Sequence, residues 1–175
     1  MNSNYWFSIA ELTIKLIFKE DGLNNLSLLP SFSPFEIAEP SKEDNLFELT
    51  IDDKTAPIAK SERVRIKTID TGNGNIIVDQ TNDGRHQFII KDINGNSCCL
   101  LIANKEFSVC QCALNGNYDM RSFGLNNAIM IAYAFASCKY NTLLIHASLV
   151  RQNGYGYAFI AKSGTGKSTQ VSMWL

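Results

Sequence analysis

The sequence predicts an α+β protein with two domains, a β-rich antiparallel region over residues 1–118 and a second unit over 119–175. Two observations support this class. Up to about residue 114, short apolar runs of strand type alternate with Asn–Gly turns, and helical periodicity is absent. After residue 118, a helix-forming stretch precedes two strands and a glycine-rich loop, which is the start of an α/β unit.

The strands of the first region are placed by its apolar runs, and the turns by its glycines and asparagines. The expected strands cover 5–18, 47–51, 64–67, 76–78, 87–90, 99–102 and 107–114. The turns fall at 72–75, 82–84, 94–96 and 115–117, a spacing typical of an antiparallel meander. Pro30 and Pro34 withhold ladder donors, so we expect residues 28–35 to be a loop packed over the sheet, with peptide binding as the alternative.

The expected helix covers residues 123–138 and is apolar on nearly every face. Such a helix must be buried, and it is too short, and too polar at Asn126 and Asn127, to span a bilayer. We expect it to pack beneath the sheet of the second unit. Two strands follow at 142–150 and 155–160, joined by a turn at 152–154.

Charge and cysteine content exclude several classes of function. A formal net charge of −1 without blocks of like charge argues against nucleic-acid and membrane partners. The N-terminus lacks the basic region of a signal peptide, so we expect a cytoplasmic protein. The odd number of cysteines then predicts buried, reduced thiols instead of disulfides or a zinc site; they are Cys98, Cys99, Cys110, Cys112 and Cys138.

Residues 161–168 read AKSGTGKS and match a phosphate-binding P-loop, except that Ala161 replaces the usual first glycine. Gly164 and Gly166 still let the backbone approach phosphate and adopt positive φ. The apolar strand before the loop and the expected helix at 169–175 supply the strand, loop and helix order that the motif requires. The predicted nucleotide-binding residues are Ser163, Gly164, Thr165, Gly166, Lys167, Ser168 and Thr169.

Three side chains are candidates for chemistry at this loop. Lys167 is the catalytic candidate, because it would reach the β- and γ-phosphates of ATP, and Ser168 would place its hydroxyl on Mg²⁺. His146 lies one strand earlier, and the turn at 152–154 brings its strand back beside the loop. From the residues alone, His146 is either a buried histidine bonded to backbone or a metal or phosphate contact.

The segment His146-Ala147-Ser148, a short hairpin and the loop together resemble the HPr kinase/phosphorylase and phosphoenolpyruvate carboxykinase group of P-loop proteins. The resemblance covers about residues 143–172. In carboxykinases the corresponding histidine helps to bind the divalent metal, which favours His146 as a metal ligand. The resemblance implies ATP and Mg²⁺ as cofactors, and a protein serine or small molecule as the phosphoacceptor.

The chain reaches Leu175 before any acidic strand end that would complete a metal site. Because an α/β domain needs several parallel strands to bury its sheet, we expect a truncated domain and an inactive fragment of a longer kinase. Two alternatives stay open: a phosphoenolpyruvate carboxykinase-like lyase, and a non-catalytic module whose β-rich region binds a protein. The sequence leaves the oligomeric state open.

Overall fold

The computed structural model describes residues 2–19, 22–42, 44–162 and 164–174. They form two compact units, Met1–Tyr140 and Asn141–Leu175. The first unit is a large sheet with one long helix, which confirms the α+β class. The division falls after Tyr140 and not after residue 118, because the helix packs on the first sheet and so belongs to the first unit.

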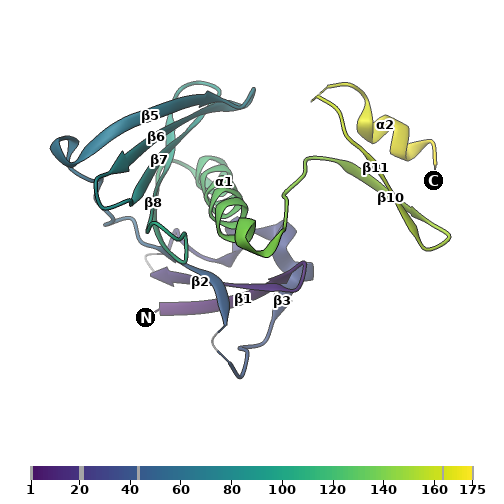
Figure 1. Ribbon diagram of the computed structural model, residues 1–175, viewed down its shortest axis with the longest axis horizontal. Coiled ribbons are helices and arrows are strands. Elements are labelled where there is room, and N and C mark those ends of the chain that lie inside the picture. The colour runs from purple at the N-terminus through teal and green to yellow at the C-terminus, as the bar shows by residue number, and fades with distance from the viewer. Residues whose placement is uncertain (1, 20–21, 43, 163, 175) are drawn as a thin grey trace. The chain divides into compact units, whose positions relative to one another are not determined.

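Nine strands make up the sheet of the first unit, counted over its described residues, in the order β3-β1-β2-β4-β9-β8-β7-β6-β5 (Figure 1). The strands are β1 (Asn2–Ile9), β2 (Leu12–Lys19), β3 (Glu36–Ile37), β4 (Asn45–Ile51), β5 (Arg63–Asp70), β6 (Gly74–Thr81), β7 (His86–Asp92), β8 (Ser97–Ala103) and β9 (Val109–Leu114). From β5 to β9 each strand pairs antiparallel with the next, so the predicted meander is confirmed.

The prediction of a wholly antiparallel region is wrong at β4, which runs parallel to both of its neighbours, β2 and β9. Each pairing joins strands separated by a long connection: residues 20–44 lead from β2 to β4, and the whole meander lies between β4 and β9. Parallel pairs require such crossovers, and local turn signals do not reveal them. As expected for a central strand, Phe47, Leu49 and Ile51 of β4 are fully buried.

The single strand expected over residues 5–18 is in fact the hairpin β1–β2. Its turn is formed by Ala10 and Glu11, which have φ of 49° and 66°. A tight hairpin turn requires positive φ at both positions, a conformation in which glycine and asparagine are common. The sequence therefore carries no turn signal at this hairpin, although the structure makes one.

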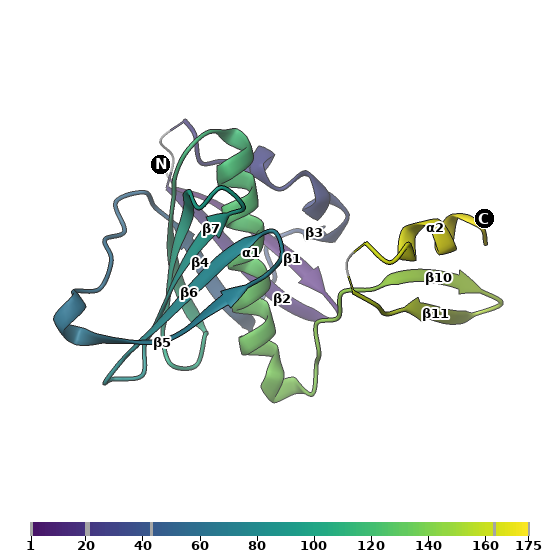
Figure 2. The ribbon, with the colours of Figure 1, turned by 90° about the horizontal axis from the view of Figure 1, so that it is seen from above.

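The helix α1 (Tyr118–Ser137) lies in the curve of the sheet, where it contacts β4, β7, β8 and β9 (Figures 1 and 2). Asn117 caps its N-terminus by accepting a hydrogen bond from the Met120 amide at 3.0 Å. At Gly124 the helix comes so close to β8 that an added Cβ would lie 2.8 Å from the Cys98 carbonyl oxygen. The expectation that this helix is part of the second unit is wrong, because its apolar surface packs on the sheet of the first unit.

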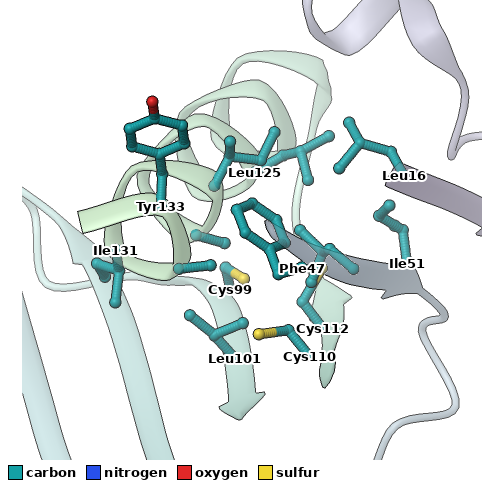
Figure 3. Close-up of a cluster of buried hydrophobic side chains, with 14 of the residues drawn as sticks. Leu16, Phe47, Ile51, Cys99, Leu101, Cys110, Cys112, Leu125, Ile131 and Tyr133 are labelled. Atoms are coloured by element: carbon teal, nitrogen blue, oxygen red, sulfur yellow. The ribbon is translucent and has the colours of Figure 1, made fainter. Parts of the chain in front are cut away.

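Side chains from α1 and the sheet interlock in the core shown in Figure 3. Phe47 and Leu101 from the sheet meet Leu125 and Ile131 from the helix there. Cys99, Cys110 and Cys112 contribute to the same apolar layer.

Buried cysteines are confirmed for four of the five, all of them free thiols: Cys98, Cys99, Cys110 and Cys112. Burial raises the pKa of Cys110 to about 12, which keeps it a protonated, unreactive thiol. Cys138 is exposed, so the expectation of burial is wrong for this one. It follows α1 directly, in the short 3₁₀ turn η4 (Cys138–Tyr140), beyond the end of the packed helix.

The proline-containing segment forms two short 3₁₀ helices, η1 (Leu26–Leu28) and η2 (Pro30–Phe35). Leu28 and Leu29 are buried, and the Phe32 ring meets Phe7 edge-to-face at 5.7 Å. This packing role is the one expected for residues 28–35. A further 3₁₀ turn, η3 (Lys60–Glu62), precedes β5.

A buried polar cluster ties α1 to the segment after β4. Arg121, only 5% exposed, donates to the Asp53 carboxylate, to Asn24 Oδ1 at 2.8 Å and to the Leu114 carbonyl at 3.2 Å. Burial alone would raise the pKa of Asp53, but hydrogen bonds from Arg121, Asn24 and the Leu114 amide together lower it below its ordinary value. The carboxylate therefore stays charged beside the guanidinium.

Candidate functional site

The second unit contains the elements that carry the loop. Its antiparallel hairpin consists of β10 (Ser148–Gln152) and β11 (Tyr155–Phe159), and a short helix, α2 (Lys167–Ser172), follows the loop. Asn153 and Gly154 make the hairpin turn with φ of 52° and 84°, as the sequence predicts. The first strand is shorter than expected, because residues 142–147 are not in a strand. The helix begins at Lys167, two residues before the expected start.

Two glycines give the loop its shape. Gly164 and Gly166 have φ of 82° and 85°, in the left-handed region that favours glycine. An added Cβ at either position would meet nothing within 4 Å, so these glycines serve the backbone path and not close packing. The space beside both residues is open to a ligand.

Lys167 folds back over the loop from the first residue of α2. Its Nζ donates to the Ala161 carbonyl at 2.9 Å and to the Lys162 carbonyl at 3.2 Å. The Thr165 hydroxyl also donates to the Lys162 carbonyl, at 2.8 Å. These bonds hold a cationic nitrogen against the loop backbone.

A hollow of about 400 Å³ opens beside the loop. Its lining residues are Ala158, Phe159, Ile160, Ala161, Thr165, Gly166, Lys167 and Gln170. The lining therefore combines an apolar strand end with a lysine and a hydroxyl.

The first turn of α2 carries three further candidates. The Gln170 amide bonds to the Gly166 carbonyl at 2.9 Å, so the amides of Lys167, Ser168 and Thr169 come before the first bond within the helix. Ser168 and Thr169 are exposed on this turn. Ser163, the remaining predicted binding residue, lies outside the described residues. Backbone amides, two hydroxyls and one lysine are groups that suit a phosphate.

His146 is exposed, so the reading of a buried, backbone-bonded histidine is wrong. The hairpin pairs Ser148 with Phe159, and the chain therefore enters β10 and leaves β11 at the same end. His146 lies two residues before Ser148, and Ala161 lies two residues after Phe159. The described residues contain no group of three or more His, Cys, Asp or Glu side chains able to hold a metal, and His146 as a metal ligand stays a prediction.

One feature of this unit escaped the sequence reasoning. The Trp174 ring lies 5.2 Å from the ring of Tyr157 and 5.8 Å from that of Phe159, edge-on to the latter. Tyr157 and Phe159 are two residues apart in β11, so their side chains share one face of the hairpin. That alternation of aromatic residues was the available signal.

Comparison with protein-family models, with curated proteins and with solved structures gave no match for this chain. Within the described part of the chain, no helix combines the length and the apolar character needed to cross a membrane. The candidate site thus depends on the loop sequence and on the geometry of the loop, hairpin and helix.

Proposed function

We propose that this chain belongs to an ATP-binding, HPr kinase-like protein that, in its complete form, transfers a phosphoryl group to a protein serine or a small molecule. The observation that carries the proposal is the arrangement of Lys167. Its Nζ lies against the carbonyls of Ala161 and Lys162, in a loop shaped by two left-handed glycines and beside an open hollow. This arrangement suits a phosphate group, since the loop offers a cation and backbone donors together.

In this proposal each group of the loop has a defined task. The Lys167 ammonium exchanges its two carbonyl partners for phosphate oxygens and stabilises the negative charge on the transferred group. The Ser168 hydroxyl and His146 would hold Mg²⁺. That ion, when bound, supplies charge neutralisation at the phosphates. Ala161 removes one glycine from the usual loop, which leaves Gly164 and Gly166 to provide the backbone path.

The test measures nucleotide binding in the full chain through a signal that comes from the second unit. The chain has two tryptophans, so Trp6→Phe leaves Trp174 as the only tryptophan and makes fluorescence report on the second unit. We expect Mg-ADP and Mg-ATP to change the Trp174 fluorescence. We also expect both nucleotides to raise the melting temperature of the second unit, followed by the same signal. By mass action, a ligand at one hundred times its Kd adds about 2.7 kcal/mol to the unfolding free energy.

Lys167→Ala should remove both effects, while Lys162→Ala should keep them. The second variant is a matched control, because Lys162 is an exposed lysine of the same loop whose contribution to these bonds is its backbone carbonyl. Equal nucleotide responses in the Lys167→Ala protein and its parent would contradict the proposal. A parent that responds to neither nucleotide would contradict it as well.

A further inference from the structure

The helix that carries Lys167 and Ser168 has little buried surface to hold it in place. Over the described residues of the second unit, the one buried side chain is Val150, which is 7% exposed. The α2 helix has six residues, too few for a stable helix by itself. Something outside the helix must therefore fix its position on the hairpin.

The aromatic contacts of Trp174 supply that attachment. Trp174 follows α2, and its amide bonds back to the Val171 carbonyl at 3.0 Å. Its ring packs on Tyr157 and Phe159, on the hairpin face that also presents Val150, since Val150 pairs with Tyr157. One face of the hairpin is thereby joined to the C-terminal end of the helix.

We infer that Trp174 is a positioning residue for the loop: its contact with Tyr157 and Phe159, here called the clasp, holds α2 on the β10–β11 hairpin and so places Lys167 and Ser168. This inference rests on the proposed nucleotide function for its purpose, although the clasp itself is a structural claim. The path is short and connected. The Phe159 ring meets Trp174, and two residues after Phe159 the chain reaches Ala161, whose carbonyl accepts the bond from Lys167 Nζ.

Two variants of Trp174 and one of the residue before it test whether Trp174 positions the loop or only supports folding in general. Trp174→Ala removes the ring, and Trp174→Phe keeps an aromatic ring for the contact with Tyr157 and Phe159. Met173→Ala is the matched control, because Met173 is the preceding residue and its side chain is 75% exposed. All are made in the full chain.

The first readout is amide hydrogen exchange without nucleotide. We expect Trp174→Ala to speed exchange at the Gln170 and Met173 amides, which bond to Gly166 and Thr169, with no change in the strands of the first unit. Trp174→Phe should restore slow exchange, and Met173→Ala should match the parent. Unchanged exchange in Trp174→Ala would overturn the clasp.

The second readout is the Kd for Mg-ADP, measured by calorimetry. Trp174→Ala should weaken binding by roughly five- to tenfold, the size expected for loss of an aromatic pair, with recovery in Trp174→Phe. An unchanged Kd in Trp174→Ala would overturn the positioning role. If the parent binds no Mg-ADP while exchange depends on Trp174, the nucleotide proposal fails and the positioning role fails with it, but the clasp stands as a structural contact.

Discussion

The two units of this protein differ in what holds them together. In the first unit, a nine-stranded sheet and α1 bury a continuous apolar core in which Phe7, Phe18 and Phe47 have no exposed surface. In the second unit, Val150 is the one buried residue among those described, and large apolar side chains such as Leu149 and Ile160 are 65% exposed. The second unit is defined by hairpin pairing, two glycines and a few side-chain bonds. It has a loop with two left-handed glycines, but no apolar core among its described residues.

The largest effect should come from the core of the first unit. Phe47→Ala removes a fully buried ring beneath α1, so we expect the free energy of unfolding of this unit to fall by about 3–5 kcal/mol. Leu149→Ala, in the exposed part of β10, should change stability by no more than about 0.5 kcal/mol. Urea unfolding followed by circular dichroism measures both. Similar losses in the two variants would break the comparison between the units.

An intermediate effect should come from the polar cluster that ties α1 to the segment after β4. Asp53→Asn leaves the Arg121 guanidinium buried without its carboxylate, which should cost about 2–3 kcal/mol. Asp52→Asn is the control, because Asp52 pairs with Lys19 at the surface and should contribute less than about 1 kcal/mol.

The same cluster predicts how stability depends on pH. The pKa of Asp53 is lowered from its ordinary 3.8, so the folded state binds this proton less readily than the unfolded state. Its contribution is present above the unfolded pKa and is lost as pH falls through the folded pKa. The Asp53→Asn protein should therefore lose less stability than the parent as the pH falls from neutral to below 3.8, the ordinary pKa of this carboxyl group. Parallel pH profiles in acid would show that Asp53 is not involved.

The smallest effects should distinguish two uses of glycine. Gly124→Ala places a Cβ against the Cys98 carbonyl and Cys99, so we expect about 1–3 kcal/mol of destabilisation from overpacking between α1 and β8. Gly164→Ala meets no neighbouring atom, and its cost of about 1–2 kcal/mol comes from the left-handed backbone alone.

The readout for Gly164→Ala is local, since this loop adds little to global stability. Amide exchange around Thr165 should report it, while the unfolding midpoint of the first unit stays unchanged. For Gly124→Ala the midpoint itself should fall. If Gly164→Ala lowered that midpoint as much as Gly124→Ala does, the stability of the first unit would depend on the second, contrary to this prediction.

Local signals predicted much of this structure. Asparagine and glycine placed the turns at 72–75, 82–84 and 94–96 and the turn of the β10–β11 hairpin, because few other residues adopt positive φ readily. The turn between β8 and β9 was not predicted, since it has no Asn–Gly pair and its positive φ falls on Phe107. The hairpin turn at Ala10 and Glu11 was missed for the same reason, since neither residue type signals such a turn. Gly164 and Gly166 likewise have the positive φ that the loop sequence predicted.

The sequence by itself determined the α+β class, the meander, the burial of four cysteines and the position of the glycine-rich loop. Each follows from side-chain periodicity or backbone preference within a short stretch of chain. Only the tertiary structure decided that β4 runs parallel to β2 and β9, that α1 packs on the sheet of the first unit, and that Trp174 packs on Tyr157 and Phe159. These features join segments far apart in sequence, and an apolar helix or strand can satisfy its burial against more than one surface. Which surface it covers depends on the shape of the whole assembled sheet.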